Sequence, residues 1–146
     1  MKPSASEACT IPVGAHLSTP RRGFTHHGIH IGNGRVVHYP GSSRRFDTGP
    51  ITVVSITEFA RGRGWRIEHT PCSFAADEIV RRAESRIGEH AYRVTNNNCE
   101  HFCFWCLTGR PHSEQVDHYL RPIARIFAWL GASMPQRLQP AVVVSA

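Results

Sequence analysis

Three cysteines lie within eight residues of one another in the segment TNNNCEHFCFWCLTG, which covers positions 95–109. A thiolate is a strong nucleophile and a good metal ligand, whereas a buried thiol behaves as a small apolar side chain. A cysteine is therefore reactive only where its surroundings favour the thiolate or bring a base to the thiol. The local position of each of the three cysteines must therefore show whether it is reactive or a core residue.

The segment predicts a helix with the cysteines on one stripe. Asn97 and Glu100 have the spacing of a capping box, which makes Asn97 the expected N-cap and puts Cys99 in the first helical turn. The unpaired N–H groups and the positive end of the helix dipole favour a thiolate there. Cys103 and Cys106 lie further along the stripe, and we expect both to be core residues.

Candidate bases lie in the segment THHGIHIGNGRVVHYPG, which predicts a β-hairpin. Alternate residues of a strand share a face, so His26, Gly28 and His30 lie together. Histidine is the usual base for a thiol because its imidazole titrates near neutral pH. The competing interpretation is that these histidines are polar strand residues that face solvent.

The turn of this hairpin decides where its last histidine lies. A two-residue loop would pair Ile29 with His38, whereas a three-residue loop at 32–34 pairs Gly28 with His38. We predict the second register because it collects the apolar residues on one face. It makes His26 and His38 diagonal neighbours, and Gly28 leaves room beside them.

A metal site is the main alternative for these residues. Three cysteines on one helical stripe spread over about 10 Å, so one tetrahedral zinc cannot reach the first and the last. A zinc site built from His26, His30, His38 and Cys99 stays open as an alternative. Our main expectation is a site without metal or cofactor.

Composition describes an ordinary globular protein. The chain has 146 residues, of which 40% are hydrophobic and 19% charged, as expected for one domain. The net charge of +6 comes from dispersed basic residues. Because no nucleic-acid-binding signature accompanies them, we expect no nucleic-acid partner.

The cysteines and the apolar pattern bear on location. The segment MKPSASEACTIPVG lacks the apolar stretch of a signal peptide, and no run approaches the roughly eighteen apolar residues of a membrane span. The cysteine count of five is odd, and three lie on one helical stretch that hardly permits bridging. We therefore expect reduced thiols and a cytoplasmic protein.

The remaining segments supply the elements that position these residues. Strands are predicted within 12–19, 51–57 and 64–70, a helix from an N-cap at Ser73 to near Gly88, and an end of the cysteine helix at Gly109. The expected fold is α+β, a small antiparallel meander packed with about three helices. We expect a flexible arm at 1–10, a catalytic domain at 11–117, an amphipathic helix at 118–132 and a flexible tail at 133–146.

The amphipathic segment 118–132 has two interpretations. Its apolar residues recur at helical spacing, and Arg121 and Arg125 lie elsewhere on the helix. Such a stripe usually docks on the core of its own domain. A basic amphipathic helix with Trp129 would also suit the interface of a membrane, which would make the protein peripheral to it.

Taken together, THHGIHIGNGRVVH and NNCEHFCFWCLTG resemble the two motif blocks of the lecithin:retinol acyltransferase (LRAT) family. That family includes the H-Ras-like suppressor phospholipases/acyltransferases and shares its architecture, in permuted order, with NlpC-type papain-like proteins. The resemblance covers residues 12–117. The matching positions are His26, Gly28, Gly32, His38, Asn98, Cys99, Glu100, His101, Phe102 and Gly109.

The resemblance implies a catalytic site and a substrate class. It implies Cys99 as nucleophile, His26 as general base and acid, and His38 as the residue that orients His26. Supporting positions would be His30, Asn98, Glu100, His101 and Gly28. Acyl transfer or hydrolysis of a lipid ester would then pass through a thioester.

The resemblance leaves two alternatives and shows two departures. The alternatives are a thiol amidase or peptidase with the same residues, and a non-catalytic binding or regulatory module. His30 replaces the tyrosine usual in that strand position. We also expect the chain to lack the long membrane-spanning tail of vertebrate members.

Overall fold

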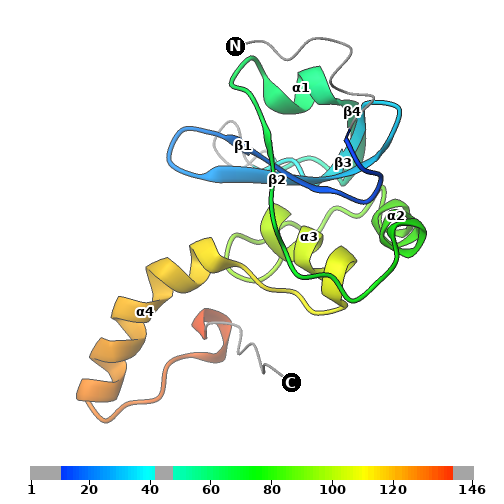
Figure 1. Cartoon of the computed structure of the whole chain (residues 1–146). Helices are drawn as coiled ribbons and strands as arrows, with labels where there is room; N and C mark the ends of the chain where they lie inside the picture. Colours follow the sequence, from blue (N-terminus) through cyan, green and yellow to red (C-terminus); the bar gives the residue numbers. More distant parts are fainter. Residues whose placement is uncertain (1–10, 42–47, 140–146) are drawn as a thin grey trace.

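The computed structural model describes residues 11–41 and 48–139, and its architecture is the predicted α+β fold (Figure 1). Its strands form one antiparallel sheet in the order β4-β3-β2-β1-β5. The strands are β1 (His16–Pro20), β2 (Thr25–Gly32), β3 (Arg35–His38), β4 (Thr52–Ser55) and β5 (Arg66–Ile67). The helices are α1 (Ile56–Ala60), α2 (Ala76–Ser85), α3 (Cys99–Thr108), α4 (Glu114–Trp129) and a short 3-10 helix at Gln136–Leu138.

The predicted hairpin register is confirmed, although the turn that produces it differs. Gly28 pairs with His38, as expected. Asn33 and Gly34 form a two-residue turn with positive φ angles of 52° and 64°, which is the conformation that favours Asn-Gly. The predicted three-residue loop is therefore wrong: a bulge between His30 and Gly32 supplies the extra residue instead.

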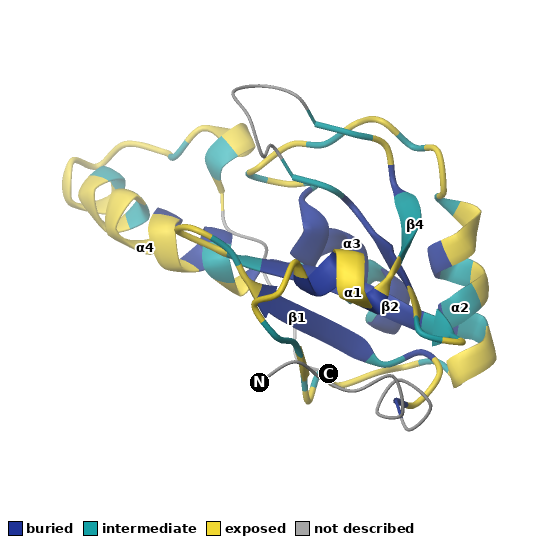
Figure 2. Cartoon of the chain, turned by 90° about the horizontal axis from the view of Figure 1, so that it is seen from above, coloured by how far each residue is buried: buried dark blue, intermediate teal, exposed yellow. Residues whose placement is uncertain are grey.

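The core lies on both faces of the sheet. One cluster joins Ile29 and Val37 to residues of α2 and α3, and a second lies under α1 around Phe59. Figure 1 shows α1 on one side of the sheet and α3 on the other, and Figure 2 shows β1 and β2 buried between them. Because both faces are covered, even the three histidines of β2 are buried.

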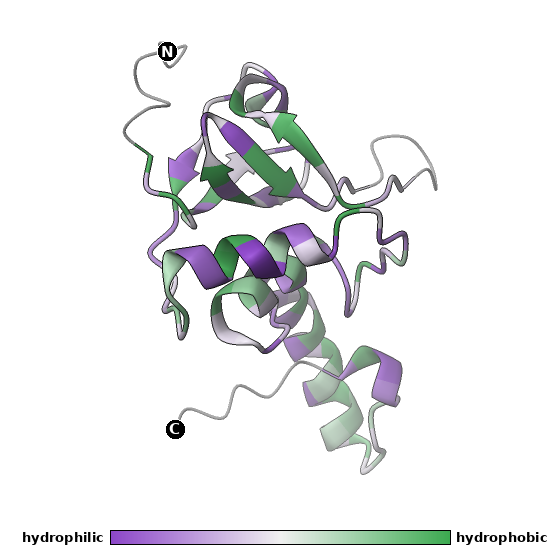
Figure 3. Cartoon of the chain, turned by 90° about the vertical axis from the view of Figure 1, so that its right-hand side faces the viewer, coloured by the Kyte–Doolittle hydropathy of each residue, from purple (hydrophilic) through white to green (hydrophobic). Residues whose placement is uncertain are grey.

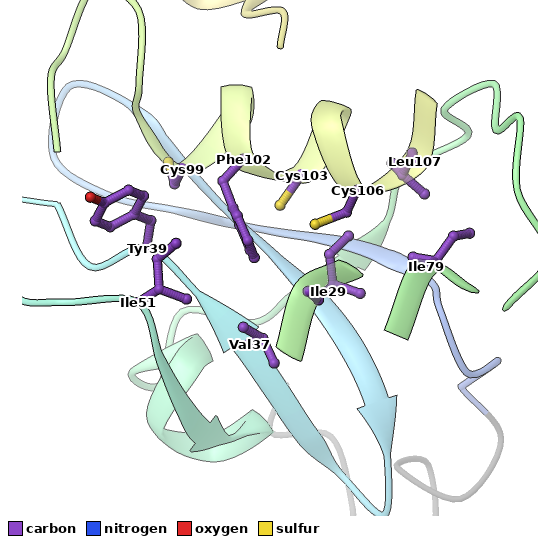
Figure 4. Close-up of a cluster of buried hydrophobic side chains, with 11 residues drawn as sticks. Ile29, Val37, Tyr39, Ile51, Ile79, Cys99, Phe102, Cys103, Cys106 and Leu107 are labelled. Atoms are coloured by element: carbon purple, nitrogen blue, oxygen red, sulfur yellow. The ribbon is translucent and has the colours of Figure 1, made fainter. Parts of the chain in front are cut away.

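The two later cysteines of α3 are core residues, as predicted. Cys103 and Cys106 are fully buried. Figure 4 shows them directed from α3 towards Ile29 and Val37 on the sheet. Gly109 ends the helix in the left-handed conformation, which confirms the predicted end.

Two predicted element ends are wrong for local reasons. The β-branched run stops being a strand at Ser55, because the Ser55 side chain caps α1 in a capping box with Glu58. Helix α2 begins after Ala75, not Ser73, whereas its end at Ser85 lies near Gly88, as predicted. Ser73 instead donates its N–H to the carbonyl at the end of α3.

Helix α4 begins docked and ends exposed. Ser113 caps it, and Val116 and Leu120 are buried against the domain. Beyond Leu120 the helix extends away from the body (Figure 1), with Ile126 and Trp129 exposed to 58% and 84%. Coloured by hydropathy, this helix carries both apolar and polar segments (Figure 3).

Candidate active site

The start of α3 is capped one asparagine later than predicted. The Asn98 side chain accepts from the N–H groups of Glu100 and His101, both at 3.0 Å, and the Asn98 N–H donates to His101 Nδ1 at 3.3 Å. The capping box is thus Asn98 with His101, because the Asn97 side chain is bonded elsewhere, to the Ala91 carbonyl among others. The shift makes residue 99 the first helical residue.

Cys99 is buried, and burial controls its ionisation. Only 2% of the residue is exposed, and it packs with Tyr39 and Phe102 (Figure 4). Burial raises the pKa of the thiol to about 12, although backbone N–H groups of His27, Glu100 and Cys99 itself are directed at the sulfur and lower it. The helix start alone therefore does not produce a thiolate at neutral pH, contrary to our expectation. The thiol needs a base.

His26 and His38 form the predicted neighbouring pair. His26 Nε2 lies 2.7 Å from His38 Nδ1, and both residues are buried. They do not face solvent. A Cβ on Gly28 would lie 2.5 Å from Val36 and 2.9 Å from Phe59, so glycine is required for this packing.

Burial also makes this histidine pair neutral near pH 7. Desolvation, followed by the charge of its partner, lowers the pKa of His26 well below its usual value. Desolvation lowers the pKa of His38 to about 4. The His26 ring packs 5.4 Å from the ring of Phe59, on the α1 face of the sheet. Its Nδ1 has no hydrogen-bond partner among the described residues.

Cys99 lies beside an edge of β2 that β3 leaves open. The backbones of Phe24 and His30 bond to the β1 side of the sheet. By antiparallel alternation, Thr25 and His27 direct their N–H and C=O groups to the opposite edge. Strand β3 ends at His38, which pairs with residue 28. No residue of β3 therefore pairs with Thr25 or His27 at this edge. The His27 N–H faces the sulfur there.

The structure thus brings together some of the predicted site residues. It joins His26 to His38, and it places the Cys99 sulfur at the N–H of His27, the residue after His26. Within residues 11–41 and 48–139, no hydrogen bond joins Cys99 to either member of the pair. The catalytic roles of these three residues stay predictions.

His30 takes a separate position on its strand. Its Nδ1 lies 3.0 Å from the Pro12 carbonyl, and its Nε2 is buried without a partner in the described part of the chain. In that same part, no three His, Cys, Asp or Glu side chains are arranged to hold a metal ion. The four residues of the zinc alternative are therefore not assembled as a ligand set.

Glu100 connects the start of α3 to the start of α4. It is buried, and its Oε2 accepts from Ser113 Oγ at 2.5 Å, from Gln115 Nε2 at 3.2 Å and from the Gln115 N–H at 3.3 Å. Among the predicted supporting residues, Asn98 and His101 shape the helix start, whereas Glu100 ties it to the following segment.

The match to known proteins follows the same segments. Residues 9–112 match the family model described as lecithin retinol acyltransferase. The chain belongs to the lecithin retinol acyltransferase family.

Similar proteins carry names of two kinds. The chain is 30% identical over 135 residues to human lecithin retinol acyltransferase, covering 73% of this chain and 59% of that protein. It is 29% identical over 123 residues to human phospholipase A and acyltransferase 2, covering 71% and 75%, and 25% identical over 135 residues to human phospholipase A and acyltransferase 5, covering 82% and 48%. The chain thus spans little more than half the length of the lecithin retinol acyltransferases it matches.

Sequence reasoning missed a second histidine pair in this member of the family. His16 Nε2 lies 2.9 Å from His27 Nδ1, and both residues line a cavity of about 850 Å³ together with Glu100 and Gln115. The strand alternation placed His27 on the apolar face of its strand, but no pattern in the sequence indicated that His16 would contact it. A contact between strands is set by register, which single-strand patterns do not specify.

Tyr92 packs against the core cluster that contains Cys99. Burial raises the pKa of its phenol, and the Cys99 charge raises it further, so the hydroxyl stays protonated near neutral pH. The sequence placed Tyr92 only among the usual surroundings of the family motifs.

Proposed function

We propose that this protein is a thiol-dependent acyltransferase or phospholipase that acts on a lipid ester, with Cys99 as nucleophile and His26 as general base. The family and the names of the similar proteins support a lipid ester as the substrate class. The observation that carries the proposal is the neutral pair His26–His38. His26 is followed in the sequence by His27, whose backbone N–H faces the Cys99 sulfur.

The proposed tautomer follows from the hydrogen bond within the pair. For His26 Nδ1 to accept the thiol proton, the ring must carry its own proton on Nε2. That N–H then donates to His38 Nδ1 at 2.7 Å. His38 thereby orients the His26 ring and stabilises the imidazolium that forms, as the third member of a catalytic triad does.

In the first step the Cys99 sulfur attacks the ester carbonyl carbon as its proton passes to His26 Nδ1. The carbonyl oxygen becomes an oxyanion, and the N–H groups of His27 and of the helix start, which face the sulfur, are the donors that we propose for it. The bond to the leaving alcohol then breaks, and that alcohol takes the proton from His26. The product is an acyl thioester on Cys99.

In the second step an alcohol, an amine or water attacks the thioester. His26 takes its proton and returns it to the departing sulfur, so the enzyme is restored. Because burial raises the pKa of the thiol and lowers that of the base, we propose that proton transfer accompanies the attack. A resting thiolate–imidazolium pair is not required.

We also propose that the exposed half of α4 contacts a membrane surface. Ile126, Trp129 and Leu130 are exposed apolar residues, and Arg121 and Arg125 supply charge that anionic headgroups attract. No helix among the described residues is long and apolar enough to cross a bilayer. A cytoplasmic location with peripheral membrane contact is our proposal; the unbridged thiols of residues 72, 99, 103 and 106 are consistent with it.

The test compares lipid and peptide substrates. Wild-type protein, Cys99→Ser and the exposed control Cys72→Ser are incubated with phosphatidylcholine vesicles, with and without an alcohol or amine acceptor, and with model peptides. We expect release or transfer of fatty acid by the wild type and the control only. Cleavage of peptide without turnover of lipid would favour a thiol peptidase. Equal turnover by Cys99→Ser, or none by any protein, would contradict the proposal.

A further inference from the structure

Gln115, in the first turn of α4, has contacts on both sides of the candidate site. Its side chain lies 90 residues from Thr25 and 15 from Glu100 in the sequence, yet it bonds to both. We propose that Gln115 is a positioning residue that holds the strand bearing His26 against the helix bearing Cys99. This inference rests on the proposed function of those two residues.

The Gln115 amide pairs with the backbone of the residue before His26. Its Oε1 accepts from the Thr25 N–H at 2.8 Å, and its Nε2 donates to the Thr25 carbonyl at 3.1 Å. These two backbone groups point to the edge of β2 that β3 has already left. A side-chain amide carries a donor and an acceptor as a peptide group does, so it continues the pairing beyond the end of β3.

The Gln115 amide also lies close to His27 and Glu100, the residues that follow His26 and Cys99 in the sequence. Gln115 Nε2 lies 3.4 Å from Nε2 of His27, the residue after His26. It also lies 3.2 Å from Oε2 of Glu100, the residue after Cys99. One side chain therefore contacts the two chain neighbours of the proposed base and one neighbour of the proposed nucleophile.

Gln115 is itself held in place by the helix start. Its backbone N–H is 3.3 Å from Glu100 Oε2, and Ser113, the N-cap of α4, donates to the same oxygen at 2.5 Å. The first turn of α4 is thus seated on the first turn of α3. Loosening the contact with Thr25 would let the start of β2 move relative to Cys99, and a displacement of about 1 Å costs a reaction roughly 100-fold.

The Gln115 amide also faces one member of the second histidine pair. Gln115 Nε2 is a donor only, and it lies 3.1 Å from the Thr25 carbonyl, 3.2 Å from Glu100 Oε2 and 3.4 Å from His27 Nε2. A proton on His27 Nε2 would therefore face another donor, so we expect this nitrogen to be unprotonated. His27 then carries its proton on Nδ1 and donates it to His16 Nε2 at 2.9 Å. This tautomer is a spectroscopic signature of the contact.

The test uses the isosteric variant Gln115→Glu, with Gln115→Ala beside it and Gln136→Glu, an exposed site, as matched control. The glutamate keeps the acceptor for Thr25 but loses every donor. We expect kcat per folded molecule on phosphatidylcholine vesicles to fall about 10- to 100-fold, with KM within about twofold. Imidazole ¹⁵N shifts should show His27 protonated on Nδ1 in the wild type and on Nε2 in Gln115→Glu, where a carboxylate faces it.

The outcomes separate this inference from the proposed function. If no acyl transfer is seen with wild-type protein, the proposed function fails. The rate at which iodoacetamide alkylates Cys99, measured in a background that carries both Cys9→Ser and Cys72→Ser, then reports on positioning by itself. An unchanged rate and unchanged kcat in Gln115→Glu, or a loss of kcat that only follows the loss of folded protein, would overturn the inference. So would a proton on His27 Nε2 in the wild type, a measurement that needs no variant.

Discussion

Two histidine pairs lie on opposite faces of β2, and they are alike in most respects. The pair His26–His38 has an N···N distance of 2.7 Å, and the pair His16–His27 has one of 2.9 Å. All four residues are buried. Burial is the largest cause of a lowered pKa in each of them. Neither burial nor the direction of the pKa shift therefore identifies the reactive pair.

The pairs differ in what their outer nitrogens do. His16 Nδ1 bonds to Thr70 Oγ1 at 2.6 Å, and His27 Nε2 faces the Gln115 amide, so both ends of that pair are occupied. His26 Nδ1 has no hydrogen-bond partner in the described residues. A perturbed histidine is a candidate base only when it keeps a nitrogen for the substrate or the nucleophile. This difference favours His26 over His27 as the base.

The largest expected effect on kcat comes from replacing Cys99, for which we propose the pair His26–His38, and not the pair His16–His27, as the base. Cys99→Ser should lower kcat by about 10³-fold or more, because the hydroxyl is a far weaker nucleophile in this setting. The matched buried control is Cys103→Ala, which we expect to lower the free energy of unfolding by about 1 kcal/mol and leave kcat of the folded protein unchanged. Turnover assays together with urea unfolding measure both quantities. A comparable loss of kcat in both variants would remove the distinction between the two cysteines.

A smaller effect separates the histidine pairs directly. His26→Gln should lower kcat by about 10²-fold or more, since it removes the general base. His16→Gln should leave kcat within a few-fold and lower the free energy of unfolding by about 1–3 kcal/mol, because it breaks a buried hydrogen-bonded chain. If His16→Gln lost as much activity per folded molecule as His26→Gln, the assignment of the base would be wrong.

The smallest expected effect is on the pH dependence of stability, and it is the same for the two histidine pairs. The folded pKa values of His16 and His38 are lowered from 6.5 to about 3 and about 4, and those of His26 and His27 are lowered too. Below pH 6.5 the unfolded chain therefore binds more protons than the folded one, and stability falls as the pH falls.

The stability from these histidines is fully present above pH 6.5, and its loss levels off below the folded pKa values. Each contributes a slope of at most about 1.4 kcal/mol per pH unit. Urea unfolding between pH 7 and pH 5 should show this slope in wild type and a shallower one in both His16→Gln and His38→Gln. Stability that is independent of pH in this range would contradict the burial of neutral histidines.

The sequence predicted those features that depend on local pattern. The alternation of Ile29, Ile31 and Val37 determined the hairpin register and hence the meeting of His26 and His38. The period of the cysteine helix likewise placed Cys103 and Cys106 in the core. Patterns of this kind follow from the geometry of one strand or one helix.

The features that the sequence did not predict depend on distant contacts. Three successive asparagines offer the same capping group, and the bonding of Asn97 to the segment before α3 left Asn98 as the cap. The raised pKa of Cys99 comes from the sheet that buries it. The contact between Gln115 and Thr25 crosses 90 residues, so no local spacing records it.

The most direct test of the central claim is to look for the acyl group on Cys99. Protein incubated with phosphatidylcholine vesicles is quenched in acid, digested and analysed by mass spectrometry. We predict an acyl thioester on the peptide that contains Cys99, labile to neutral hydroxylamine, absent in Cys99→Ser and strongly reduced in His26→Gln. Turnover of lipid with the acyl group on another residue, or with none on Cys99 after rapid quenching, would contradict the account.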